Sequence, residues 1–193
     1  MRTSWSESDL RRFLNGVFYD KFSGWEKALI AETIIINKVV PTYNIQSLAA
    51  YTAEVNRIKE NPSYSYGVKN GTNTSDKIFL LSIDEVVKYF GGSGRIEEGD
   101  FYSIVIDDQF NKNRMAYTDE GVANDWWLRS PGSGSLLPGR FVVPCITCVL
   151  DDGRIEVTGN MISKECGVRP ALWLNLEFIL SDPKTPQVGN SIY

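Results

Sequence analysis

Apolar residues near the start of the chain recur at the spacing of a helix. They lie three or four residues apart, as on one face of an α-helix, and are Leu10, Phe13, Leu14 and Val17. Ser6 and Asp9 have the spacing of an N-terminal capping pair, and Trp5 just before them can pack against the first turn. Gly16 is typical of a helix end. We therefore predict a helix that begins at Ser6 and ends near Gly16.

A second helix is predicted to begin at Ser23. Ser23 and Glu26 are spaced as a capping box, in which each side chain accepts a hydrogen bond from the backbone N–H of the other residue. Trp25 and Leu29 would then face the core. The β-branched run TIIINKVV, residues 33–40, predicts a strand that ends at the following proline.

Residues 45–60 again show helical spacing, and a polar loop follows over residues 61–75. Tyr64 and Tyr66 lie on the same side of this loop if the chain is extended. Exposed tyrosines among serine, asparagine and glycine form an adaptable contact surface. Because loops carry function more often than cores do, these two tyrosines are the preferred binding locus.

The segment DKIFLLSIDEVVKYFGG, residues 76–92, contains the clearest unit of the chain. A short apolar strand leads to Ser82, which caps a helix together with Glu85. The helix is predicted to end at Gly91, because glycine accepts the backbone conformation that follows a helix.

The last third of the chain has the pattern of short strands. Strands are predicted over residues 126–130, 141–150, 154–159 and 166–174. Residues 151–153, Asp-Asp-Gly, are a strong hairpin signal because glycine accepts a positive φ. Helices in the N-terminal half, followed by these strands, predict an α+β fold in which the helices pack on a small, mostly antiparallel sheet.

The composition has the ordinary balance of a soluble globular protein, with 42% hydrophobic and 23% charged residues among 193. A net charge of −4 argues against a nucleic-acid partner, because neutralising phosphates requires clustered lysine and arginine. No apolar run approaches the ~20 residues that cross a bilayer, so no membrane insertion is expected. Histidine is absent, which excludes a Ser-His-Asp triad, a Cys-His dyad and a histidine metal site within the chain.

Two adjacent tryptophans are the most conspicuous candidate for a ligand platform. In a strand, Trp126 points to one face, and Trp127 and Arg129 point to the other. Both faces are apolar where the strand begins, which favours a buried strand in which Arg129 needs a carboxylate or carbonyl partner. A ligand-facing role for the three residues stays open. Residues 124–125, Asn-Asp, do not complete a calcium site, which needs roughly six to eight oxygen ligands, and no metal is expected.

The three cysteines, Cys145, Cys148 and Cys166, are too few for a disulfide scaffold. A strand places Cys145 and Cys148 on opposite faces, whereas a redox pair prefers the start of a helix. Cys148 and Cys166 could meet across adjacent strands, but buried thiols are the favoured interpretation, and no cofactor is expected.

Acidic residues at 97–100, 107–108 and 151–152 have the chemistry for general acid–base catalysis. Each group falls in a predicted loop or turn, where acidic residues are favoured for solvation and local hydrogen bonds. No catalytic residue is therefore assigned.

Four segments occur together in an order that resembles a bacterial family of domains of unknown function, found mostly in Firmicutes and gut bacteria. The segments are residues 5–30, residues 76–90, WWLRSPG at 126–132 and GVRPALWL at 167–174. That family is distantly similar to the C-type-lectin-like superfamily, which includes the formylglycine-generating (sulfatase-modifying) enzymes, since GVRPAL resembles their Gly-Phe-Arg ending. The resemblance implies a C-type-lectin-like core and an extracellular or cell-envelope location. Independently of the resemblance, the chain length suits a single domain over residues 1–176, and the polar, proline-bearing end of the chain predicts a tail over residues 177–193.

The resemblance also implies structural roles. Family members usually carry further strands before this first helix, and without them one edge of the sheet would need a cover. Arg169 would tie the last strand to neighbouring carbonyls or carboxylates, and Gly167 would sit where a backbone comes close or φ is positive. Trp5, Trp25 and Trp173 are expected to be structural as well.

Three hypotheses for function follow. The preferred one is a non-catalytic binding or surface-recognition module that binds a protein or a glycan. The second is an oxidase-like or hydrolytic enzyme, related to the formylglycine-generating enzymes, that uses Cys148 and Cys166 or the loop carboxylates. The third is a structural or assembly domain, in which a partner chain supplies the missing edge strand of an oligomer.

Overall fold

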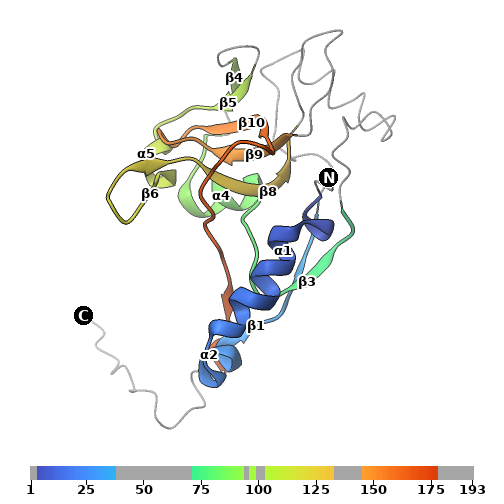
Figure 1. Ribbon diagram of the computed structural model, residues 1–193. Coiled ribbons are helices and arrows are strands. Elements are labelled where there is room, and N and C mark those ends of the chain that lie inside the picture. The colour runs from blue at the N-terminus through green and yellow to red at the C-terminus, as the bar shows by residue number, and fades with distance from the viewer. Residues whose placement is uncertain (1–3, 38–70, 94–95, 99–102, 133–144, 178–193) are drawn as a thin grey trace, which may run out of the picture.

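A five-stranded antiparallel sheet forms the body of the protein, with strands in the order β4-β5-β10-β9-β8 (Figure 1). The computed structural model describes residues 4–37, 71–93, 96–98, 103–132 and 145–177. The five strands are β4 (Ile96–Glu98), β5 (Ile104–Ile106), β8 (Trp126–Pro131), β9 (Cys145–Val149) and β10 (Ile155–Met161). The predicted mixture of helices with antiparallel sheet is confirmed. In this described part of the chain, no helix is long and apolar enough to span a bilayer.

Three two-stranded ladders accompany the sheet. β1 (Ile30–Ala31) pairs with β11 (Trp173–Leu174), β2 (Thr33–Ile35) with β3 (Thr74–Asp76), and β6 (Ala116–Tyr117) with β7 (Ala123–Asn124). All three are antiparallel. The predicted strand over residues 33–40 is thus confirmed as far as Ile35. The helix predicted over residues 45–60, and the loop with Tyr64 and Tyr66, lie outside the described residues.

The first helix begins later and ends later than predicted. After a short 3₁₀ turn, η1 (Trp5–Glu7), α1 (Asp9–Phe13) starts at Ser8, whose Oγ accepts the backbone N–H of Arg11 at 3.1 Å. The helix continues through a π-helical stretch, η2 (Leu14–Phe18), and a last turn, η3 (Tyr19–Lys21). The prediction that Gly16 ends it is wrong, because side chains beyond it, such as that of Phe18, pack against the core and favour further turns.

The second helix, α2 (Gly24–Leu29), has the predicted capping box between Ser23 and Glu26. Leu29 is buried as expected, but Trp25 is 58% exposed, so its predicted place in the core is wrong. The reason lies in the position of the helix. α2 and β1 lie at the end of the molecule away from the five-stranded sheet (Figure 1), so that sheet does not cover the face of α2 that carries Trp25.

After β3, residues 77–82 form a mostly buried segment that leads into α4 (Ile83–Phe90). Ile78, Phe79 and Leu80 are buried, but only Phe79 forms a β-bridge, with Ala171. The predicted strand is therefore an extended buried segment with a single bridge. The predicted helix ends are confirmed, because Ser82 and Glu85 form a capping box and Gly91 has a φ of 93°.

The two strands around residues 151–153 form the predicted hairpin, in which Gly153 has a φ of 85°. The strand predicted over residues 166–174 is divided instead. Gly167 forms a parallel bridge with Trp126, Ala171 bridges Phe79, and only β11 is a paired strand. Pro170 has no N–H to donate, and the segment passes three different partners, so one continuous ladder cannot form.

The free edge of β8 is covered by the chain itself. The backbone N–H of Trp127 donates to the carbonyl of Gly167 at 3.0 Å, and that of Arg129 donates to the carbonyl of Leu81 at 3.0 Å. Gly167 in turn donates its N–H to the carbonyl of Asp125 at 2.7 Å. This edge therefore needs no strand from a partner chain.

Candidate functional site

A cleft of about 510 Å³ opens beside the start of β8. We call it the β8 cleft. It is lined by Met115, Ala116, Tyr117, Thr118, Asn124, Asp125, Trp126, Gly167, Val168 and Arg169. One wall is the β6–β7 hairpin, and another is the segment that runs along the edge of β8. The cleft thus combines apolar, aromatic, amide, hydroxyl and charged groups from three separate stretches of the chain.

Arg114 fixes the base of the hairpin. It ends α5 (Asn111–Arg114), and its buried side chain donates to the carbonyl of Gly153 at 2.9 Å and to a carboxylate oxygen of Asp108 at 2.7 Å. Burial alone would raise the pKa of Asp108. Backbone hydrogen bonds from Ser93 and Phe110, together with the charge of Arg114, nevertheless hold that pKa below its ordinary value. The hairpin therefore starts from a rigid, charge-balanced support.

Trp126 forms the floor of the cleft. It is only 1% exposed, and its indole N–H donates to the carbonyl of Arg114 at 3.0 Å. Its ring also meets that of Phe90 edge to face, with 6.5 Å between the ring centres. Trp126 is thus mainly a core residue, and it reaches the cleft beneath the side chain of Arg169.

The resemblance had implied that Arg169 bonds to neighbouring carbonyls or carboxylates. In the described structure its guanidinium instead lies against two aromatic rings. Its guanidinium carbon lies 4.7 Å from the ring centre of Phe90 and 5.1 Å from that of Trp126. Its Nη1 is buried, and within the described residues it has no hydrogen-bond partner. The backbone of Gly167, rather than the side chain of Arg169, joins this segment to β8 by hydrogen bonds. A Cβ added at Gly167 would lie 3.1 Å from the carbonyl oxygen of Asp125. A side chain at Gly167 would therefore require the backbone at Asp125 to move by a few tenths of an ångström.

Asp125 is the one acidic residue among those that line the cleft, and its charge is balanced. Lys164 donates to one carboxylate oxygen of Asp125 at 2.6 Å, and the backbone N–H of Asp151 donates to the other at 2.8 Å. The hydrogen bond to Asp125 raises the pKa of Lys164, so the lysine stays charged at neutral pH. Arg169 is therefore the cleft residue whose charge lacks a counter-ion in the described structure.

Trp127 and Arg129 do not reach the β8 cleft. They line a second, smaller cavity of about 180 Å³, together with Trp5, Leu80 and other mostly apolar residues. Arg129 donates to the carbonyl of Leu80 at 2.8 Å and to Glu85 at 3.0 Å. Arg129 thus has both a carbonyl and a carboxylate partner, and either one would have met the expectation from the sequence. Since Glu85 also caps α4, this ion pair joins the helix to β8.

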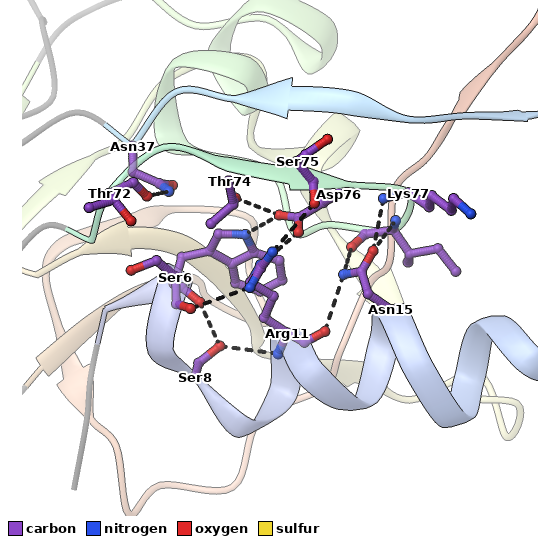
Figure 2. Close-up of polar contacts among 12 residues, drawn as sticks. Ser6, Ser8, Arg11, Asn15, Asn37, Thr72, Thr74, Ser75, Asp76 and Lys77 are labelled. Carbon is purple, nitrogen blue, oxygen red and sulfur yellow. Dashed lines mark hydrogen bonds and ion pairs between the residues drawn. The ribbon is translucent and has the colours of Figure 1, made fainter.

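A buried carboxylate that sequence reasoning missed holds the N-terminal helix in place (Figure 2). Asp76 is 1% exposed and accepts hydrogen bonds from Trp5 Nε1 at 2.8 Å, Arg11 Nε at 2.6 Å and Thr74 Oγ1 at 2.7 Å. A signal was present in the sequence, because Asp76 heads an apolar run that pattern alone assigns to the core. These contacts give Trp5 its structural role.

Asn15 adds a second connection in the same region (Figure 2). Its Oδ1 accepts the backbone N–H groups of Lys77 at 2.8 Å and Ile78 at 3.1 Å, and its Nδ2 donates to the carbonyl of Ile78 at 2.7 Å. The side chain thus satisfies backbone groups of an extended segment that has no strand partner there. These bonds join the first helix to the segment that follows β3.

Trp173 was expected to be structural, and it packs against the core from the last strand. Its ring lies 5.9 Å from that of Tyr89 and 6.4 Å from that of Phe79, measured between ring centres. It remains partly exposed because β11 pairs only with β1.

The three cysteines form no disulfide with one another, and their environment opposes ionisation of the thiols. Burial raises the pKa of Cys148, and the neighbouring Cys166 and Asp125 raise it further. Burial and the charge of Asp125 also raise the pKa of Cys166, to about 11. Asn160 Nδ2 lies 3.0 Å from Cys148 Sγ. Both thiols are therefore protonated at neutral pH, which disfavours their use as nucleophiles.

Several of the loop carboxylates have structural partners. Asp107 accepts a hydrogen bond from Asn111 at 2.7 Å, and Asp152 forms an ion pair with Arg154 at 2.6 Å. No group of three or more potential metal ligands occurs among the residues that the structure describes.

One family model, described as a domain of unknown function (DUF6273), matches residues 1–176. The predicted resemblance to a family of domains of unknown function is thereby confirmed, and the matched range includes every residue that lines the β8 cleft. No curated protein and no solved structure matches the chain.

Proposed function

We propose that this chain, which belongs to the DUF6273 family of domains of unknown function, is a non-catalytic recognition module that binds a protein or a glycan in the β8 cleft. One observation carries the proposal. The cleft, at about 510 Å³, combines an apolar and aromatic lining with a few convergent polar groups, as small-ligand sites do.

The hairpin that forms one wall supports this proposal. Its base is held by the buried side chains of Arg114 and Trp126, while Tyr117 is 60% exposed. A contact surface on a rigid support loses little conformational entropy when it binds. An exposed tyrosine supplies both ring area and a hydroxyl, as tyrosines do in antibody loops.

The C-type-lectin-like core implied by the motifs is part of the proposal. It is supported by the antiparallel sheet, by helices that precede it, and by the return of the last strand to the first, where Leu174 pairs with Ile30. An extracellular or cell-envelope location remains a prediction from the resemblance.

A ligand screen followed by mapping tests the proposal. The purified chain is screened on a glycan array and against a peptide library, and each hit is titrated into ¹⁵N-labelled protein. We expect the largest shift changes at the amides of residues 115–118, 124–126 and 167–169. Tyr117→Ala should weaken binding about tenfold, which is roughly 1.4 kcal/mol.

Val122→Ala is the matched control. Val122 lies on the same hairpin and is 59% exposed, but it does not line the cleft, so affinity should stay unchanged. Shifts that map away from the cleft, or turnover of a bound compound by the purified chain, would refute the proposal.

A further inference from the structure

We infer that the ligand of the β8 cleft presents a carboxylate, for which Arg169 is the counter-ion. This inference rests on the proposed binding function and names its ligand chemistry. Two kinds of molecule offer such a group, the C-terminus of a peptide and an acidic sugar, and separate arms of the experiment distinguish them.

Arg169 lies against two aromatic rings. Its guanidinium carbon is 4.7 Å from the ring centre of Phe90 and 5.1 Å from that of Trp126, contacts that give cation–π attraction but no hydrogen-bond acceptor oxygen. Within the described residues, Nη1 has no hydrogen-bond partner although it is buried. A buried donor without a partner costs free energy, and a ligand that accepts its hydrogen bond removes that cost.

Arg169 also differs from the other arginines that the structure describes. Each of them forms an ion pair with a carboxylate, and they are Arg11, Arg12, Arg114, Arg129 and Arg154. Burial lowers the pKa of Arg169. The group remains charged, as arginine does in proteins, so the cleft holds a partly desolvated cation that has no counter-ion among the residues the structure describes.

The charges of the cleft select a monoanion. Asp125 and Lys164 cancel each other at 2.6 Å, which leaves the single positive charge of Arg169. A carboxylate matches that charge and offers two oxygens in the plane of the guanidinium fork. A phosphate dianion would bring excess negative charge close to Asp125. Asn124 and Thr118 line the same cleft and offer polar groups to the rest of the ligand.

Binding requires a small rotation of the Arg169 side chain, because Nη1 itself is buried. No hydrogen bond is described for this side chain that would resist such a rotation, and its described contacts are those with the two rings. The indole N–H of Trp126, beneath the guanidinium, is therefore a sensitive NMR reporter of the event.

The experiment titrates defined probes into the ¹⁵N-labelled full chain. One arm compares N-acetyl-leucine with its neutral amide, and the other compares glucuronate with glucose. Inorganic phosphate tests for a general preference for anions. We expect one carboxylate probe to shift the signals of Trp126 Nε1–H and of residues 167–169, and to bind about tenfold or more tightly than its neutral counterpart.

Variants test the role of the arginine. Arg169→Gln should weaken carboxylate binding about tenfold or more, and Arg169→Lys should retain part of it, because lysine keeps the charge but loses the planar fork. Arg12→Gln, an exposed arginine on α1, should bind as the wild type does. If Arg169→Gln does not fold, the comparison of charged and neutral probes on the wild type decides the question.

The outcomes separate this inference from the proposed function. Neutral probes that bind in the cleft as tightly as the carboxylates, or an Arg169→Gln variant that keeps full affinity, would overturn the inference and leave a binding cleft in place. Equal binding of phosphate would overturn the selection of a carboxylate. The absence of any shift with either carboxylate would also overturn the inference, whereas a ligand mapped to another surface would remove both proposals.

Discussion

Replacing Asp76 with asparagine should destabilise the fold by about 3 kcal/mol, because this buried carboxylate joins the first helix to β3. Its Oδ2 accepts hydrogen bonds from Trp5 Nε1 at 2.8 Å and Thr74 Oγ1 at 2.7 Å, while its Oδ1 accepts from Arg11 Nε at 2.6 Å. Asparagine has nearly the same shape, but one of its two terminal atoms is a donor. The substitution therefore removes the charge and one acceptor without leaving a cavity.

Both orientations of the new amide leave a conflict. If its NH₂ group replaces Oδ2, the buried indole N–H of Trp5 faces another donor, and an unsatisfied buried group costs about 1–3 kcal/mol. If the amide is flipped, the NH₂ group faces the guanidinium of Arg11 instead. The lost charge-assisted hydrogen bond adds about 1–2 kcal/mol, discounted because the Arg11 side chain is 23% exposed.

Urea unfolding of four proteins measures this effect. They are the wild type, Asp76→Asn, Trp5→Phe and the double variant. In a chain of this length a loss of about 3 kcal/mol also lowers Tm by ~6–12 °C. Because Trp5→Phe removes the indole donor, Asp76→Asn should cost at least ~1 kcal/mol less in that background. A cost below ~1 kcal/mol in the wild type, or equal costs in both backgrounds, would refute the reasoning.

Two further predictions concern titratable groups. Burial raises the pKa of Glu156, so its contribution to stability is present below its ordinary pKa and is lost as pH rises through the folded-state value. Glu156→Gln should therefore be more stable than the wild type at pH 7 and nearly equal to it at pH 4 by urea midpoint. Equal differences at both pH values would contradict this. Cys148 and Cys166 should react with iodoacetamide at pH 7.5 far more slowly in the folded chain than in urea, and rapid labelling of the native protein would reopen the thiol-enzyme hypothesis.

The starts of α2 and α4 and the turn of the β9–β10 hairpin were predicted correctly from the sequence, whereas both ends of the first helix were not. Ser82 with Glu85, and Ser23 with Glu26, form their capping boxes because both partners lie within one helical turn. Gly153 turns its hairpin for the same local reason. The prediction at Gly16 failed because the helix end there depends on core packing rather than on nearby residues.

The candidate site was predicted only in part. The sequence pointed to Trp126, and the structure makes it the floor of the β8 cleft. The sequence also offered Trp127 and Arg129 as ligand-facing candidates and placed them on the opposite face of the strand, and there they line a different cavity. Arg169 was assigned a structural role, and its unpaired Nη1 became apparent only when its surroundings were known. Tyr117, on the exposed hairpin, was not singled out at all.

The sequence by itself determined the local elements: where helices α2 and α4 begin, where the β9–β10 hairpin turns, and that an antiparallel sheet follows the helices. These depend on hydrogen bonds and backbone preferences that act over a few residues. Tertiary structure alone decided that Asp76 joins Trp5 to Arg11, that Gly167 covers the edge of β8, and that Arg169 Nη1 is buried without a hydrogen-bond partner among the described residues. The free energy of a buried charge or donor depends on which groups surround it in space, and distant segments of the chain supply those groups.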